Sequence, residues 1–392
     1  MKNRKLLMIP GPIEFEPKVL QAIGAPTDSH VSPDFIETFG NSLELMRKVW
    51  QSPTGQPFIM AGSGTLAMDM AVVNLIEQND NVLVISTGYF GERYANICKR
   101  YGANVTMLTT EAGNIVSLNE IEKELSTKNY KLLTMTHVDT STGVLIDPES
   151  IAKLGIKYNT LTVLDGVCSV AGEEINQDKW EIDVVFTASQ KAIGVPPGLA
   201  LLMVSEKAIN IFKNRKTLVQ NYYADFTHWL PIMNAYESKN PSYFGTPPVN
   251  LIAALEVSLQ HIVSEGMKTR FLRHKKIATA FREAMLALGL KLLPIHKNLS
   301  ANTLTAVYYP EKIDGGAFLK HVGNNDIILA GGLLPTHKTQ YFRVGHMGSV
   351  NNNDIIATIA AIESSLIACN YPFKMGIGIK TALQILNTKS RK

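Results

Sequence analysis

Three charged residues stand at places in the sequence where apolar runs predict buried strands. Asp165 ends one apolar run, Lys191 follows another after two polar residues, and Arg343 lies inside a third. Burial lowers the pKa of a lysine and makes it a nucleophile able to form a Schiff base. A buried carboxylate needs a cationic partner, and the planar fork of an arginine suits a carboxylate. The plainer alternatives are a turn-forming Asp, a surface Lys and an internal ion pair.

A fourth segment, Ala61–Met68, joins a predicted strand to a predicted helix through small residues. Small residues let the backbone approach a ligand, and the N–H groups at a helix N-terminus favour a phosphate. The segment is neither a Walker loop nor a Gly-x-Gly-x-x-Gly fingerprint, and a tight turn without a ligand is an equal alternative. Together with Asp165, Lys191 and Arg343 it completes the parts that a pyridoxal phosphate enzyme requires. These parts are a phosphate anchor, a partner for the pyridine nitrogen, a Schiff-base lysine and a carboxylate clamp.

The elements that must position these residues alternate between short β-branched runs and helical patterns from residue 57 to about 205. The strand runs are mostly apolar, which is typical of strands covered on both faces. This alternation predicts an α/β fold with a mostly parallel seven-stranded sheet, whose ligands bind beyond the carboxyl ends of the strands. The predicted strands are 58–61, 82–86, 105–108, 132–136, 161–165, 184–188 and 199–204, and the predicted helices are 66–76, 92–101, 118–125 and 148–154.

The last third of the chain has a different pattern. A long helical stretch over 248–288 precedes predicted strands at 303–308, 327–329 and 341–344. A final helix should start at the polar cap 351–354 and place its apolar residues on one face, namely Ile355, Ile359, Ile362 and Leu366. This pattern predicts a smaller α+β unit. Residues 206–247 carry scattered aromatic side chains, and the pattern assigns them to neither unit.

Composition limits the class of protein. The chain has 392 residues, 45% of them hydrophobic and 18% charged, which allows a large core and excludes a disordered chain. A net charge of +4 is too small to predict a nucleic acid or membrane partner. Cys98, Cys168 and Cys369 are too far apart for a Cys-x-x-Cys site, and no histidines have metal-ligand spacing, so we expect no metal. The apolar run 355–362 is far shorter than the roughly 18 residues of a membrane span.

Three further motifs make the sequence similar to a known family. Ile9-Pro10-Gly11-Pro12, the segment Ser29–Phe35 and Ser189-Gln190-Lys191 resemble the class V (fold type I) aminotransferases, within them the alanine–glyoxylate and serine–pyruvate aminotransferases. The resemblance runs from Pro10 to Gly348. It implies the pyridoxal phosphate-dependent transferase fold type I. We expect an N-terminal arm at 1–22, a large cofactor-binding α/β domain at 23–255 and a small C-terminal α+β domain at 256–392.

The resemblance also implies roles for residues around the cofactor. Lys191 resembles the Schiff-base lysine, and Asp165 the residue that keeps the pyridine nitrogen protonated. Phe90 takes the place of the aromatic residue that stacks on the ring, where many relatives carry Trp. The phosphate cradle matches Ser63, Gly64 and Thr65, with Gln190 as a further donor; the family often has His where Thr65 stands.

The remaining matches concern the ring, the substrate and a second subunit. Thr140 stands where a hydroxyl meets the phenolic oxygen of the ring, and Val167 where an apolar side chain covers its other face. Arg343 matches the arginine that grips the substrate α-carboxylate. Tyr243 and Thr246 match residues that reach the phosphate from the neighbouring subunit, which implies a homodimer with shared active sites.

The expected reaction is transfer of the amino group of alanine to glyoxylate, giving pyruvate and glycine, in glycine biosynthesis or glyoxylate detoxification. Donors with a second carboxylate need a second cation, and no second arginine lies in a predicted strand. Serine–pyruvate, serine–glyoxylate, 3-hydroxykynurenine and 2-aminoethylphosphonate aminotransferases are the close alternatives. A cysteine desulfurase would need a nucleophilic cysteine on a mobile loop, whereas Cys369 ends a predicted helix. A non-enzymatic binding module would hold no cofactor.

The sequence also bears on where the protein works. It ends Ser390-Arg391-Lys392, which differs from a Ser-Lys-Leu-type peroxisomal address. The sparse, odd number of cysteines suits a reducing compartment. We therefore expect a cytoplasmic protein, with the peroxisome and the mitochondrion as alternatives.

Overall fold

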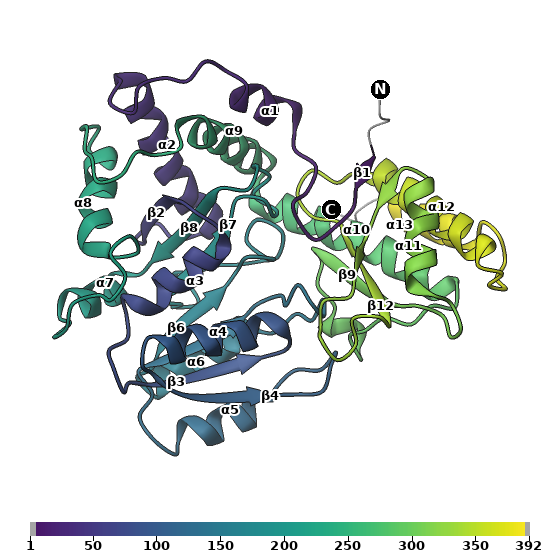
Figure 1. The fold of residues 1–392 in the computed structure, drawn as a ribbon, viewed down its shortest axis with the longest axis horizontal. Coiled ribbons are helices and arrows are strands. Elements are labelled where there is room, and N and C mark those ends of the chain that lie inside the picture. Colours follow the sequence, from purple (N-terminus) through teal and green to yellow (C-terminus); the bar gives the residue numbers. More distant parts are fainter. Residues whose placement is uncertain (1–4, 389–392) are drawn as a thin grey trace.

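A seven-stranded sheet forms the centre of the computed structural model, which describes residues 5–388. The C-terminal motif Ser390–Lys392 lies outside the described residues. The sheet confirms the predicted α/β fold, because five adjacent strands run parallel (Figure 1). In sheet order the strands are β2 (Gln56–Ala61), β8 (Leu199–Val204), β7 (Val184–Ala188), β6 (Leu161–Asp165), β5 (Leu132–Thr136), β3 (Asn81–Ser86) and β4 (Asn104–Thr109).

Strand β8 is antiparallel to both of its neighbours, β7 and β2. The reversal follows from the connection, because residues 189–198 contain no helix and are too few for a parallel crossover. The connection therefore stays at the edge where β6 and β7 end. That edge is where Asp165 and Lys191 lie.

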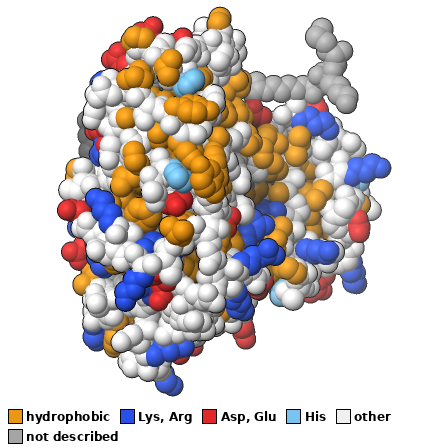
Figure 2. Space-filling view, turned by 60° about the vertical axis from the view of Figure 1, so that its left-hand side comes forward, with side chains coloured by type: hydrophobic (Ala, Val, Ile, Leu, Met, Phe, Trp, Pro, Cys, Tyr) orange, Lys and Arg blue, Asp and Glu red, His pale blue; other side chains and the backbone are white. Residues whose placement is uncertain are grey.

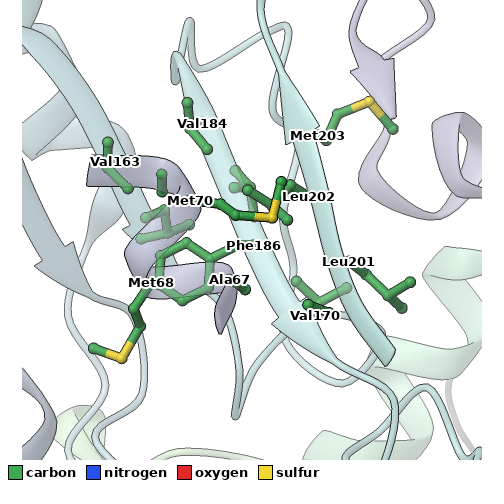
Figure 3. Close-up of a cluster of buried hydrophobic side chains, with 14 of the residues drawn as sticks. Ala67, Met68, Met70, Val163, Val170, Val184, Phe186, Leu201, Leu202 and Met203 are labelled. Atoms are coloured by element: carbon green, nitrogen blue, oxygen red, sulfur yellow. The ribbon is translucent and has the colours of Figure 1, made fainter. Parts of the chain in front are cut away.

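Helices cover both faces of the sheet. The crossover helices α3 (Gly64–Val73) and α4 (Tyr89–Arg100) pack on each other over one face, and α5 (Leu118–Leu125) and α6 (Pro148–Lys157) pack on each other over the opposite face. Figure 3 shows how Met70 of α3 meets Phe186 of β7 and Leu202 of β8 in the core. The other helices of this unit are α1 (Pro17–Ile23), α2 (Pro33–Trp50), α7 (Glu206–Lys213), α8 (Phe226–Glu237) and α9 (Val249–Glu265).

One expectation for this unit needs correction, and one unassigned segment finds its place. Strand β4 is not covered on both faces, because it is the edge strand and its side chains are partly exposed along its length. Residues 206–247, which the sequence pattern left unassigned, contain α7 and α8, and both helices pack on the large unit.

The second unit has its own hydrophobic cluster, which includes Phe281, Phe342 and Ile359. It holds an antiparallel sheet of β11 (Ala330–Gly331), β12 (Tyr341–Gly345) and β9 (Leu304–Tyr308). Its helices are α10 (Met267–Ala287), α11 (Gly315–Asn324), α12 (Asn352–Ala368) and α13 (Ile377–Leu386), and a short 3₁₀ turn spans Lys297–Leu299. Strand β1 (Leu6–Leu7), at the start of the described chain, joins this unit by pairing in parallel with β10 (Ile327–Ile328) (Figure 1).

The predicted helical stretch over 248–288 is two helices. Gly266 separates α9 from α10 with a φ of +82°, a conformation that a glycine adopts without strain. The apolar side chains of α9 join the large hydrophobic cluster, and those of α10 from Ile277 onward join the smaller one. The limits at residues 22 and 255 stay predictions.

The cap at Asn351 is confirmed, because its side chain accepts from Asn353 N and Asp354 N and α12 begins there. Ile355, Ile359, Ile362 and Leu366 are all buried, as predicted. The helix is not the final one, since α13 follows it. Within residues 5–388, no helix is both long and apolar enough to span a bilayer.

Candidate active site

Lys191 lies just beyond the end of β7, with only 8% of its surface exposed. Its Nζ donates a hydrogen bond to the carbonyl oxygen of Pro10. Gly11 has a φ of +107°, and a Cβ there would lie 2.6 Å from Lys191 Cδ, so the close approach requires a glycine. Burial lowers the pKa of Lys191, and the nearby Arg343 cation adds to this effect while Cys168 and Asp165 oppose it. The amine is thus poised as a nucleophile and a base.

Asp165 ends β6 and is 2% exposed. Its Oδ1 accepts a hydrogen bond from Val167 N at 2.9 Å. Burial raises the pKa of Asp165 to about 7, and the neighbouring Asp139 raises it further, whereas Lys191 and Arg93 oppose the rise. A buried carboxyl with so high a pKa favours a cation placed against it, such as a protonated ring nitrogen.

Arg343 comes from β12 in the second unit. Its Nε donates to Gly331 O at 2.9 Å and its Nη1 donates to Thr140 O at 3.0 Å. These bonds fix the plane of the guanidinium between the two units. Burial lowers the pKa of Arg343. Arg343 is the one arginine in the strands of residues 5–388. Its positive charge helps to lower the pKa of Lys191.

Asp139, which the sequence had not singled out as a site residue, fixes the start of α4. Its Oδ2 accepts from Phe90 N at 3.1 Å, and its Oδ1 accepts from Ser141 N at 2.8 Å and Ser141 Oγ at 2.5 Å. Ser141 Oγ in turn accepts from Tyr89 N at 3.1 Å. Burial raises the pKa of Asp139. The sequence signal that could have identified Asp139 is its position three residues after the end of β5 and one residue before Thr140.

The predicted cradle begins α3 at Gly64. The Ser63 side chain makes no capping hydrogen bond, which leaves its hydroxyl and the first N–H groups of the helix for a ligand. A Cβ at Gly64 would lie 3.2 Å from Val167 Cγ2, so the backbone runs close beside that side chain. Gln190 Oε1 is buried without a hydrogen-bond partner among the described residues. Its amide can turn to present donors, and these residues therefore fit a phosphate group.

Tyr243 and Thr246 are not brought to this cradle within one chain. The Tyr243 hydroxyl lies 3.5 Å from Thr246 Oγ1, and its ring packs on His30 at a centroid distance of 5.5 Å. Tyr243 is 63% exposed. For residues 5–388, the structure records no hydrogen bond from either side chain to the cradle, so their predicted role needs a second subunit.

The family model for aminotransferase class-V matches residues 20–340 of the sequence. The chain is a class V aminotransferase. Alanine–glyoxylate aminotransferase 1 of Saccharomyces cerevisiae is 40% identical to it over 364 residues, covering 88% of this chain and 93% of the yeast protein. L-aspartate–glyoxylate aminotransferase of Paracoccus denitrificans is 29% identical, covering 97% and 96%. The crystal structure of alanine–glyoxylate aminotransferase from Nostoc sp. is 32% identical, with a TM-score of 0.88 and coverage of 93% and 96%.

This class V aminotransferase has the fold of type I pyridoxal phosphate enzymes, and pyridoxal phosphate is its cofactor. Its substrates are amino and oxo acids. Cys369 is the C-cap residue of α12, which confirms that it ends a helix. The described residues contain no cluster of three or more metal-ligating side chains.

Proposed function

We propose that this aminotransferase moves the amino group of alanine to glyoxylate, giving pyruvate and glycine. The observation that carries the proposal is the single strand arginine, Arg343, placed near Lys191 with no second strand arginine among residues 5–388. One guanidinium clamps one α-carboxylate, which suits substrates with a small uncharged side chain. The 40% identity to the yeast alanine–glyoxylate enzyme supports the same pair.

Each of the three central residues has a task in this proposal. Bound pyridoxal phosphate supplies an electron sink for the electron pair left when the substrate Cα loses its proton. The Lys191 amine takes the proton from Cα and returns it at C4′ of the cofactor. Arg343 holds the α-carboxylate so that the Cα–H bond faces that amine.

Asp165 acts through its charge. A carboxylate at this depth is costly unless a cation faces it, so the Asp165 anion and a protonated pyridine nitrogen stabilise each other. Phe90 and Val167 would cover the two faces of the ring, with Thr140 at its phenolic oxygen. Ser63, Gly64, Thr65 and Gln190 would hold the phosphate.

We also propose a homodimer whose subunits share their active sites. Large apolar side chains are exposed on the first unit, with Leu218 at 90%, Tyr222 at 74% and Tyr243 at 63%. Figure 2 shows hydrophobic side chains gathered on the side of the molecule that carries α2 and α8. Such a surface favours a protein partner, and a second copy would carry Tyr243 and Thr246 to the neighbouring phosphate.

A subunit-mixing experiment tests the shared site. Lys191→Ala chains and Tyr243→Ala chains are each expected to be inactive or weak, whereas a heterodimer of the two would contain one intact site. Activity that returns on mixing supports shared sites. If Tyr243 served its own chain, both sites of the heterodimer would stay defective and no activity would return.

A donor and acceptor panel tests the reaction. Alanine, serine, aspartate and 2-aminoethylphosphonate are paired with glyoxylate and with pyruvate, and kcat/KM is measured for each pair. We expect alanine with glyoxylate to be fastest and Lys191→Ala to lose both turnover and the visible absorbance of the bound cofactor. Faster turnover of aspartate than of alanine, or phosphonate turnover without alanine turnover, would overturn the choice of donor.

We further propose a cytoplasmic location. The three cysteines are free thiols, two of them buried, as suits a reducing compartment. Microscopy of the tagged full-length protein would test this placement.

A further inference from the structure

Arg93 of α4 is a cation at the candidate site that none of the roles above uses. Its guanidinium carbon lies 5.0 Å from the ring centroid of Phe90 and 5.0 Å from that of Tyr89. Its Nη1 lies 3.4 Å from Thr65 Oγ1 and its Nη2 donates to the Tyr89 hydroxyl at 3.2 Å. The Arg93 side chain therefore contacts both the rings of Tyr89 and Phe90 and Thr65 of the phosphate cradle.

The contacts of Arg93 leave room for an anion. A guanidinium carries five N–H donors, and the hydrogen bonds recorded for residues 5–388 use two of them. Arg93 is partly buried, and no carboxylate of the described residues forms an ion pair with it. The positive charge of Arg93 also acts on Asp165, because it partly offsets the rise in the pKa of that carboxyl.

The geometry points to Arg93 as a further phosphate-binding residue, which places a positive charge at the rim of the cradle formed by Ser63, Gly64 and Thr65. Its planar fork suits a phosphate dianion, and the two aromatic rings hold the fork in place. The remaining candidate donors of the cradle in the same chain are uncharged, so Arg93 supplies the cationic part of the attraction. This inference rests on the cradle assigned under the proposed function.

A competing reading is that Arg93 only supports Phe90. Both readings predict that an Arg93 variant loses activity, so activity cannot separate them. They differ for a ligand that keeps the ring of the cofactor but lacks its phosphate. Pyridoxal is that ligand, because it can still react with Lys191.

The test measures binding to the full-length chain by absorbance titration, with pyridoxal phosphate and with pyridoxal. Arg93→Gln should weaken pyridoxal phosphate at least about tenfold, as expected for loss of one charge-assisted hydrogen bond, and leave pyridoxal within about twofold. Arg100→Gln, on the exposed last turn of the same helix, is the matched control and should change neither. Unchanged binding of pyridoxal phosphate, or equal loss for both ligands, would overturn the inference.

A second measurement uses the unaltered protein and so does not depend on the folding of a variant. Phenylglyoxal modifies accessible arginines, and peptide mass analysis reports the modification at Arg93. Saturating pyridoxal phosphate should slow this modification several-fold more than saturating pyridoxal does. Equal protection by the two ligands would contradict a phosphate contact. Neither measurement uses an amino donor, so a failed donor panel and a failed Arg93 test remain distinguishable.

Discussion

Replacing Asp165 by Asn should stabilise the cofactor-free protein while removing the activity. The two side chains have the same shape, and an Asn oxygen can still accept the hydrogen bond from Val167 N. What the substitution removes is the ability to ionise. Because Asp165 is buried, its charge is a cost to the folded chain whenever no cation faces it.

The size of this cost follows from the pKa values. An unfolded Asp has a pKa of about 3.9, whereas burial raises the pKa of Asp165 in the folded chain to about 7. Between these values the folded chain keeps a proton that the unfolded chain has released, so the free energy of unfolding falls as the pH rises. At about 1.4 kcal/mol per pKa unit, the full loss is about 4 kcal/mol above pH 7.

Urea unfolding of the cofactor-free chain at pH 5 and pH 8 measures this effect. Glu173 is a second buried carboxyl, and burial raises its pKa to about 7 as well, so only the difference between wild type and Asp165→Asn isolates Asp165. We expect the stability gain of Asp165→Asn to be about 3 kcal/mol larger at pH 8 than at pH 5. Glu311→Gln, at an exposed position, is the matched control. An equal gain at both pH values would refute the reasoning.

Three further predictions concern the substrate clamp, its supporting strand and the thiols. Arg343→Gln should raise KM for alanine and glyoxylate at least about tenfold and leave cofactor absorbance intact, whereas lost absorbance would argue against a substrate role. Tyr341→Phe should lower the free energy of unfolding, measured in urea, by about 2 kcal/mol. The buried Tyr341 hydroxyl accepts hydrogen bonds from Leu333 N and Leu334 N at 2.9 Å each and donates one to Ser141 O, and Phe can make none of them. Unchanged stability would show that water satisfies these groups. Alkylation of the partly exposed Cys369 should leave transamination unchanged, and a proportional loss of activity would revive a thiol mechanism.

The strands of the large sheet could be predicted because their apolar runs are continuous. Leu161–Asp165 and Val184–Ala188 are buried at every residue, and their observed ends equal the predicted ones. The antiparallel direction of β8 was not predicted, although the connection from β7 is too short for the crossover that a parallel strand needs. The break between α9 and α10 was missed because one glycine interrupts an otherwise continuous helical pattern.

The site residues could be predicted where a charged residue contrasts with the sequence on either side of it. Asp165 and Lys191 stand out because charge interrupts apolar sequence next to a strand end. The contacts of Lys191 with Pro10 and Gly11 join residues about 180 positions apart, and no local pattern reports such a pairing. Arg93 resembles any other helix arginine until the fold brings Thr65 of α3 beside it.

The pairing of β1 with β10 bears on when the enzyme can first work during its synthesis. Leu6 pairs with Ile327, and Met8 O accepts from Gly345 N, so the segment that carries Pro10 to Lys191 finds its sheet partners only among late residues. A ribosome adding about 5 to 20 residues per second takes tens of seconds to reach them. Until then the lysine lacks its N-terminal cover, and the large sheet can form before the pocket closes. Completion of the active site is therefore a late step of biogenesis, after nearly the whole chain has emerged.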